Sequence, residues 1–348
     1  MTVLEQLLPT VRRHRDSRTR PPRWRGKNNE GVLLLVTLAM LAVIMAVDPG
    51  AVSASLAGDI VRAAMDNMAL ALGVLLILLS GGIDVSFTAI AIFGGYATVT
   101  FMLDHNLDGG LWPFVVATLI GSLLGLGNAL LVAGFRLQTL IATLAMQSIV
   151  WGSLLAFVGS TYHSTLPPAL ARTGQSQLLR LGDSPVSTLV VPVALIAVSL
   201  ALVLRWTMFG RSVYAIGGDA EAAKRAGIRV GRVQTLVFAA AGALAGFAGM
   251  VHVTLVQHAS PYELVGTELS VIAAVVIGGA SDAGGRGSVQ GTVLGVLLIS
   301  LITNSLVRLG VPSFWQQAVE GLLILAGVAI QAQSRRRRTH RSPILEAR

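Results

Sequence analysis

Cysteine is absent from the 348 residues of this chain, which excludes disulfide bonds, thiol catalysis and cysteine-ligated metal sites. The six histidines are scattered along the sequence, so a histidine metal site is not expected either. Only two lysines occur, Lys27 and Lys224, and neither precedes Ser or Thr as the phosphate-binding pattern G-x-x-x-x-G-K-[ST] requires. We therefore expect no catalytic residues, no metal and no cofactor in this chain, and any ATP must be bound by another subunit.

Charged residues are also scarce, at 12% of the chain, and aromatic residues make up 5%. Hydrophobic residues reach 53%, and the mean hydropathy is +0.72. This composition is typical of an all-α polytopic membrane protein. The formal net charge is +9, but no basic face is interleaved with aromatic residues. The charge therefore indicates orientation in the membrane, and nucleic acid is not an expected partner.

Long apolar stretches predict the membrane spans. A bilayer core of about 30 Å requires about 20 apolar residues in a helix. Ten stretches are candidates, and because the second and the eighth are short, we predict about ten transmembrane helices with a range of 8 to 10. The ten expected spans are residues 31–47, 66–79, 85–103, 111–133, 139–158, 186–204, 233–256, 267–280, 288–307 and 314–330.

The basic residues predict the topology, because cytoplasmic loops carry an excess of Lys and Arg. With a cytoplasmic N-terminus, ten spans place all but four of the 26 Lys and Arg residues on the cytoplasmic side. The four exceptions are Arg62, Arg172, Arg180 and Arg308. Both termini are therefore predicted to be cytoplasmic.

Three regions follow from this topology. They are a basic cytoplasmic segment over residues 1–30, a transmembrane domain over residues 31–331 and a basic cytoplasmic tail over residues 332–348. A cleaved signal peptide is the alternative for the first segment, but its polar part is too long and the apolar run that follows exceeds the usual length. The arginine run of the tail is a stop signal that can also contact anionic membrane lipid.

A charged loop over residues 205–232 interrupts the apolar sequence near its middle. Asp219 is a good N-cap, residues 220–226 are strong helix formers with Lys224 and Arg225 in the last turn, and Gly227 suits the C′ position. We expect a short amphipathic helix at the membrane face, and a soluble partner can bind this helix. The alternative is an ordinary basic loop that only fixes the topology.

The stretch from Ser80 to Ser86, with the sequence Ser-Gly-Gly-Ile-Asp-Val-Ser, predicts an interrupted helix between two apolar spans. Charged residues at membrane depth are costly, so Asp84 indicates a polar pathway or a break in a helix. In one interpretation, the glycines act as a hinge and the polar side chains bind a polar solute. In the other, the stretch is a tight cytoplasmic turn in which Asp84 caps the next helix.

Two further features are candidates for the pathway. A second glycine-rich break covers residues 278–287, and polar residues recur along the fifth span, where they either line a pathway or bond between helices. The full set of pathway or hinge candidates is Ser80, Gly81, Gly82, Asp84, Ser86, Thr88, Thr139, Thr143, Gln147, Gly278 and Gly279. In the seventh span, small residues at Gly242, Gly246 and Gly249 predict close packing against another helix.

Four stretches in the same order, together with two shorter ones, carry a resemblance to a known family. They are residues 80–86, 137–144 (Leu-Gln-Thr-Leu-Ile-Ala-Thr-Leu), 210–219 and 266–279, followed by the run Gly-Gly-Arg-Gly at 284–287 and the helix entry at 311–316. Together they resemble the ribose-type permease subunits of ABC transporters over residues 60–330. Thr88 stands where that family commonly has glycine, which bears on the flexibility of the first break.

The resemblance implies a function. This chain would form the translocation pathway for a sugar or sugar-like solute in the bacterial inner (plasma) membrane, as a multi-pass subunit that is not itself an enzyme. Its implied partners are an ATP-binding cassette ATPase, an extracytoplasmic solute-binding protein that meets residues 160–185, and a second permease subunit, the same or related. The implied ATPase-coupling residues are Gly210, Arg211, Gly217, Gly218, Asp219, Glu221, Lys224, Arg225 and Gly227.

An ion-coupled secondary transporter of a small polar solute is the alternative function. That class requires an ion site built from paired intramembrane acids or from an acid with a basic partner. The acids of this sequence are single and scattered. The identity of the solute and the choice between a homodimer and a heterodimer stay open at this point.

Overall fold

A computed structural model describes residues 54 to 308 continuously, together with isolated positions on either side of that range. The basic terminal segments and most of the first and last expected spans lie outside the described residues. The predictions of cytoplasmic termini and of three regions therefore stay predictions.

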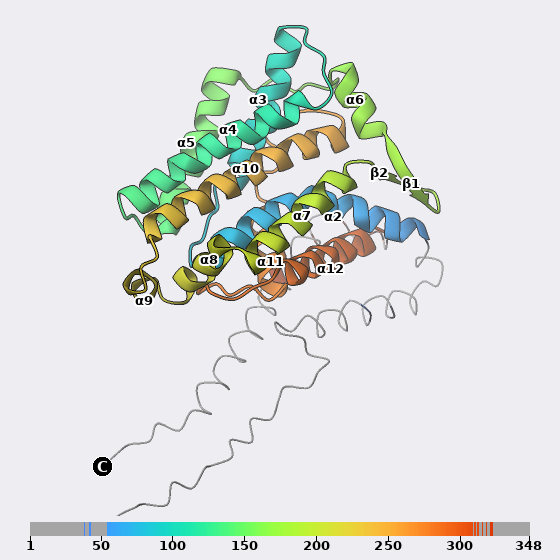
Figure 1. The fold of residues 1–348 in the computed structure, drawn as a ribbon. Coiled ribbons are helices and arrows are strands. Elements are labelled where there is room, and N and C mark those ends of the chain that lie inside the picture. The colour runs from blue at the N-terminus through green and yellow to red at the C-terminus, as the bar shows by residue number, and fades with distance from the viewer. Residues whose placement is uncertain are drawn as a thin grey trace, which may run out of the picture.

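Helices account for most of the described chain (Figure 1). The helices that correspond to expected spans are α2 (Ala54–Leu79), α3 (Phe87–Asp104), α4 (Trp112–Ala129) continued by the π-helix η2 (Leu130–Gly134), α5 (Thr139–Ser153) continued by η3 (Leu154–Val158), α7 (Val190–Trp206), α10 (Val230–Val256), α11 (Glu268–Ile277) and α12 (Val289–Arg308). Within the described residues, 5 helices are long and apolar enough to cross a membrane, or up to 7 if each of two bent pairs is one span. The polytopic helical class is confirmed, and the count of about ten stays a prediction.

Some expected boundaries are wrong for physical reasons. Helix α2 begins at Ala54 and not at residue 66, and it is bent by 48° between Met65 and Asn67, where the second span was expected to begin. The polar side chains in its first half have partners: Ser184 donates to Asp59, and Arg62 donates to the carbonyl of Leu255. The sixth span begins at Val190 and not at residue 186, because the preceding residues belong to a strand.

The all-α prediction misses a small hairpin in the loop predicted for residues 160–185. After α6 (Pro168–Gln175), strand β1 (Gln177–Leu181) pairs antiparallel with β2 (Ser184–Ser187). Gly182 supplies the positive φ of 62° that the turn between the strands requires.

Helix α10 packs through its glycines, as the sequence predicts. A Cβ atom on Gly246 would lie 2.0 Å from the carbonyl oxygen of Ala117, and one on Gly249 would lie 1.8 Å from that of Ala91. The backbones of α10, α4 and α3 therefore approach so closely that only glycine fits at these positions.

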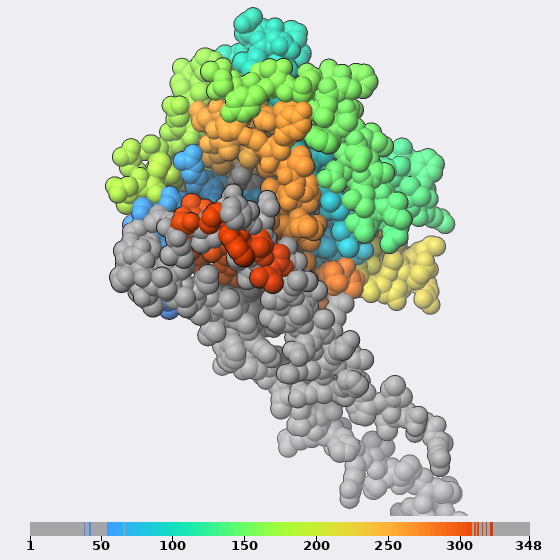
Figure 2. Space-filling view, turned by 180° about the vertical axis from the view of Figure 1, so that it is seen from behind, coloured from blue at the N-terminus to red at the C-terminus, as the bar shows by residue number. Residues whose placement is uncertain are grey.

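Basic residues lie near both ends of the long helix α10. Its 27 residues correspond to about 40 Å of helix. Arg229 and Arg232 stand at its start, next to α9 (Ala220–Arg225), whereas Arg62 bonds to Leu255 at its end. Figures 1 and 2 both show α9 projecting at one edge of the molecule, away from the turn between α3 and α4.

Candidate functional site

The segment between α2 and α3 is extended, and side chains of α5 satisfy its backbone. The hydroxyl of Thr139 accepts a hydrogen bond from the amide of Ile83 at 3.2 Å. The hydroxyl of Thr143 accepts one from Val85 at 3.3 Å and lies within hydrogen-bond distance of the Ile83 carbonyl. Non-helical backbone inside a membrane requires such partners within the protein. Thr139 and Thr143 are four residues apart, on one face of α5, and this face holds the segment.

Asp84 belongs to a local turn within this segment. Its side chain is buried, and its Oδ1 atom accepts hydrogen bonds from both the amide and the hydroxyl of Ser86, each at 2.7 Å. Asn128 of α4 donates to the same hydroxyl at 2.7 Å. No side chain caps the first turn of α3. The described contacts of Asp84 are thus those of a turn, and Asp84 does not line the cavity described next.

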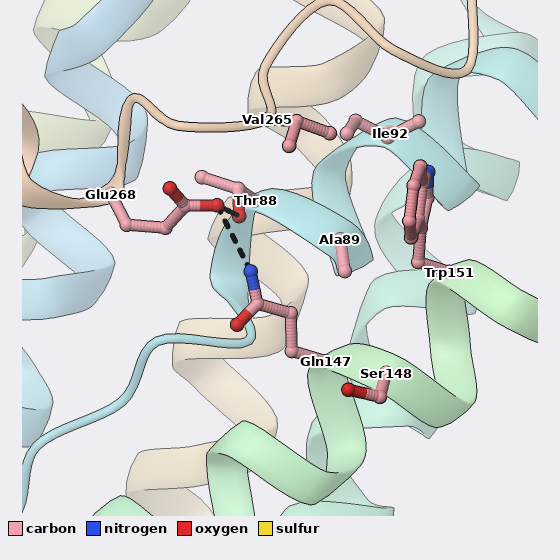
Figure 3. A pocket seen from close by; sticks show the side chains of 8 residues that line it. All are labelled: Thr88, Ala89, Ile92, Gln147, Ser148, Trp151, Val265 and Glu268. Atoms are coloured by element: carbon pink, nitrogen blue, oxygen red, sulfur yellow. Dashed lines mark hydrogen bonds between the residues drawn. The ribbon is translucent and has the colours of Figure 1, made fainter.

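The first turns of α3 and α11 meet beside the same face of α5. The hydroxyl of Thr88 donates to Oε1 of Glu268 at 2.6 Å, and the side-chain amide of Gln147 donates to the same oxygen at 3.0 Å (Figure 3). Thr88 and Glu268 are both buried. Because helix N-termini favour negative charge, the two first turns stabilise the Glu268 carboxylate at this position.

A cavity of about 290 Å³ adjoins this trio. Trp151 forms part of its wall, and the ring is fixed because its Nε1 donates to the carbonyl of Pro261 at 3.0 Å. Both hydrogen bonds to Glu268 use Oε1, which leaves Oε2 without a donor among the described residues. The residues that line the cavity are Thr88, Ala89, Ile92, Gln147, Ser148, Trp151, Val265 and Glu268. The cavity thus combines an apolar and aromatic wall with a buried acceptor.

The path of the two segments explains why α3 and α11 begin at the same depth. The first segment follows α5 from Thr139 to Thr143, which corresponds to about 6 Å of helix. Thr88 at the start of α3 then meets Glu268, to which Gln147 also donates. The second, residues 257–267, approaches from the opposite side: Trp151 bonds to Pro261 and Gln147 to Glu268. Two interrupted helices that enter from opposite sides are a known basis for solute sites in transporters.

The structure brings some of the predicted pathway residues together and separates others. Thr88 and Gln147 line the cavity, and Thr139, Thr143 and Ser86 organise the approach to it. Gly82 lies against Thr139, whereas two other predicted glycines lie elsewhere: Gly81 lies against Gly217 near the end of α8, and Gly278 packs against α12 at the far end of α11.

Sequence reasoning missed the residue at the centre of the site. Glu268 stands at the start of a short apolar span, where a single carboxylate is expected to be near a membrane boundary. The structure places it in the interior, bonded to two helices that are distant in sequence. A buried acid that opens an unusually short span is the signal that points to such a site.

The charged loop contains two helices where the sequence predicted one. Helix α8 (Met208–Gly218) is bent by 75° from α7, and its N-cap is Thr207, whose hydroxyl accepts from the Gly210 amide at 3.1 Å. The sequence analysis did not predict this helix.

Helix α9 follows, and the prediction of its caps is confirmed. Asp219 accepts from the amide of Ala222 at 2.9 Å, so it is the N-cap. Gly227 has a positive φ of 87°, and the amides of Gly227 and Ile228 donate to the carbonyls of Lys224 and Ala223. This is the Schellman arrangement that ends a helix.

The surface of residues 207–228, called the docking segment after the contact with a soluble partner that the sequence predicts, is charged. Arg211, Glu221, Lys224 and Arg225 are exposed. Gly210 and Gly217 are buried instead, so these two glycines serve packing within the protein.

Comparison with known proteins identifies the family. The family model described as branched-chain amino acid transport system / permease component matches residues 56–328. The chain belongs to this family. The resemblance to transport permeases that the motifs predict is thereby confirmed.

Individual relatives are import permeases. The chain is 30% identical over 299 residues to the ribose import permease protein RbsC of Escherichia coli strain K12. This match covers 85% of this chain and 92% of the relative. The chain is 31% identical over 309 residues to the autoinducer 2 import system permease protein LsrC of Yersinia enterocolitica, covering 88% and 84%. For the protein of the same name in Enterobacter sp. strain 638, the identity is 31% over 330 residues, covering 92% and 91%. No solved structure matches this chain.

Proposed function

We propose that this chain is the permease subunit of an ATP-driven importer for a sugar or sugar-like solute in the bacterial inner membrane. The observation that carries the proposal is the cavity where the first turns of α3 and α11 meet at Glu268. The relatives named as ribose and autoinducer 2 permeases support the class of solute.

The cavity has the chemistry that a hydroxyl-bearing ring requires. Oε2 of Glu268 accepts a hydrogen bond from a solute hydroxyl, and the Gln147 amide and Thr88 hydroxyl can exchange their bonds with the solute. The face of Trp151 packs against the apolar face of the ring. The volume of about 290 Å³ is close to the lower bound of about 300 Å³ for small-molecule sites.

Energy enters through the docking segment. In our proposal, a separate ATPase subunit binds ATP and seats α8 and α9 in a groove, which places this end of the bundle in the cytoplasm. The exposed charges of Arg211, Glu221, Lys224 and Arg225 support this contact. ATP-driven movement of the segment would change the relative positions of α3 and α11, and so would open the cavity to one side at a time.

Two other surfaces of the bundle are available for the remaining partners, one at the end opposite the docking segment and one along α4 and α5. We expect a soluble binding protein to deliver the solute near α6 and the hairpin β1–β2, at the end of α10 away from the docking segment. We expect a second permease subunit, the same or related, or membrane lipid to cover the exposed apolar residues of α4 and α5, such as Leu119, Leu123 and Ile141.

Reconstitution tests this function. The permease, its ATPase and its binding protein are assembled in liposomes, and uptake of radiolabelled ribose, other pentoses and hexoses is measured with and without ATP. We expect uptake of at least one of these solutes that requires both ATP and the ATPase. Uptake driven by a proton or sodium gradient without the ATPase would instead establish the ion-coupled alternative.

A further inference from the structure

Three segments of backbone meet at the end of α8. The amide of Gly285 donates to the carbonyl of Leu79, the last residue of α2, at 3.0 Å. A Cβ atom on Gly217 would lie 1.9 Å from that same carbonyl oxygen and 2.5 Å from the Gly285 nitrogen. Gly284 has a φ of 84°, and its Cβ would lie 2.6 Å from the Gly217 oxygen and 2.7 Å from the Cα of Gly81. The contact is therefore made by backbone atoms alone, with no room for a side chain.

A second bond ties α8 to the same loop. The hydroxyl of Tyr214 donates to the carbonyl of Gly287 at 3.0 Å. Tyr214 precedes Gly217 by three residues, so both lie on one face of α8. This face contacts the loop 278–287 at two points, Gly287 through Tyr214 and Gly285 through Gly217.

The two segments in contact with α8 lead to the two interrupted helices. The carbonyl of Leu79 marks the beginning of the segment that continues to α3 and Thr88. The loop 278–287 follows α11, which begins with Glu268. Backbone-to-backbone contact without intervening side chains is close-packed and transmits displacement. A shift of α8 must therefore move the connections of both α3 and α11.

We propose that Gly217 and Tyr214 are positioning residues that couple the docking segment to both interrupted helices. This inference rests on the proposed function, since it states how movement of α8 reaches the Thr88–Glu268 contact. We call the contact of Gly217 and Tyr214 with Leu79 and the loop 278–287 the junction. The junction transmits displacement in both directions, so occupancy of the cavity also changes the position of α8 on the ATPase. The consequence is that ATP hydrolysis and solute passage are linked through these two residues.

The ratio of the uptake rate to the rate of ATP hydrolysis tests the proposal, because a purely structural defect would lower both rates together. The assembled transporter in liposomes is measured for ribose uptake, or for uptake of the solute of the panel that the wild type transports best. ATP hydrolysis is measured in the same samples. For Gly217→Ala we expect retained hydrolysis with uptake per ATP reduced about tenfold or more, as expected for loss of a close-packed contact. For Tyr214→Phe we expect a reduction of about fivefold, the factor that corresponds to one net hydrogen bond.

Gly231→Ala is the matched control. Gly231 is also a helical glycine next to the docking segment, but a Cβ there meets nothing within 4 Å. Its uptake per ATP should equal that of the wild type. If Gly217→Ala fails to assemble, Tyr214→Phe, which removes a single hydroxyl, decides the question.

The outcomes separate this inference from the function on which it rests. A wild-type complex without ATP-dependent uptake overturns the proposed function. The wild-type complex can transport solute while Tyr214→Phe and every assembled Gly217→Ala complex keep wild-type uptake per ATP. This result overturns only the proposed coupling through the junction.

Discussion

Thr88 and Glu268 lie 180 residues apart in the chain, and a hydrogen bond of 2.6 Å joins them at the first turns of α3 and α11. Helix α3 begins inside the bundle after an extended segment, and α11 begins after a series of turns. Helix α5 supplies partners to both connections. The centre of the molecule is therefore a polar point held by three helices, next to a cavity lined by Trp151. A solute site in this position is exposed to one side or the other by small relative movements of α3 and α11.

Removal of the Glu268 carboxylate should impair transport strongly. Glu268→Ala deletes the acceptor shared by Thr88 and Gln147 and leaves the buried Thr88 hydroxyl without that acceptor, which costs about 1–3 kcal/mol. We expect uptake by the reconstituted transporter to fall at least about tenfold. Glu268→Gln, which keeps one acceptor oxygen, should retain more activity than Glu268→Ala. Thr118→Val is the control, because it removes a hydroxyl that bonds to the carbonyl of Phe114 within α4, and equal losses in Thr118→Val and Glu268→Ala would contradict a specific contribution of Glu268.

Thr143→Val should destabilise the extended segment. The variant keeps the shape of the side chain but removes the acceptor for the Val85 amide, and burial of that unpaired amide costs about 1–3 kcal/mol. We expect a lower melting temperature in detergent and reduced uptake. The matched control is Thr235→Val, because the Thr235 hydroxyl bonds only to the carbonyl of Gly231 within its own helix. A Thr143→Val protein with the melting temperature of the wild type would show that the segment does not need the bond from Thr143.

The N-cap of α9 should matter for binding of the ATPase. Asp219→Ala removes the acceptor for the Ala222 amide and should cost about 1 kcal/mol of helix stability. The yield of co-purified ATPase should decrease, and Asp219→Ser, which restores a capping oxygen, should recover most of it. If Asp219→Ala and Asp219→Ser retain the ATPase equally poorly, the carboxylate contacts the partner directly and its capping is not what matters.

Acid should weaken the contacts that Glu263 makes in the segment 257–267, which leads into α11. Burial raises the pKa of Glu263, but hydrogen bonds and charge from His252 and His258 outweigh burial and hold it below its ordinary value of 4.5. A depressed pKa means that the stabilisation is complete above pH 4.5 and is lost as the pH falls through the lower value in the folded state. The difference in melting temperature between wild type and Glu263→Gln should therefore shrink as the pH falls below 4.5. A difference that grows toward acid would contradict the assigned interaction.

Local features of the sequence predicted local structure well. Asp219 and Gly227 define both ends of α9, because capping depends on residues that are close in the chain. The spacing of Thr139, Thr143 and Gln147 placed them on one face of α5 for the same reason. The small residues of α10 predicted its close packing, since glycine recurs there with a helical period.

Contacts between distant segments were beyond sequence reasoning. Glu268 looked like an isolated acid because its partners, Thr88 and Gln147, belong to α3 and α5. Gly217 was assigned to a docking surface by resemblance, whereas its packing against Leu79 and Gly285 depends on the fold as a whole. The polar first half of α2 hid its length, because the partners of Asp59 and Arg62 lie in the hairpin and in α10.

Uptake measured with and without an intact docking segment shows whether an ATPase drives transport through this segment. Liposomes containing the permease, its ATPase and its binding protein are compared with liposomes in which residues 219–227 of the permease are replaced by a flexible Gly-Ser linker, with ATP and with no nucleotide. We expect concentrative uptake only for the intact permease with both ATPase and ATP present. Concentrative uptake by the linker variant, or by the permease alone without nucleotide, would contradict this expectation.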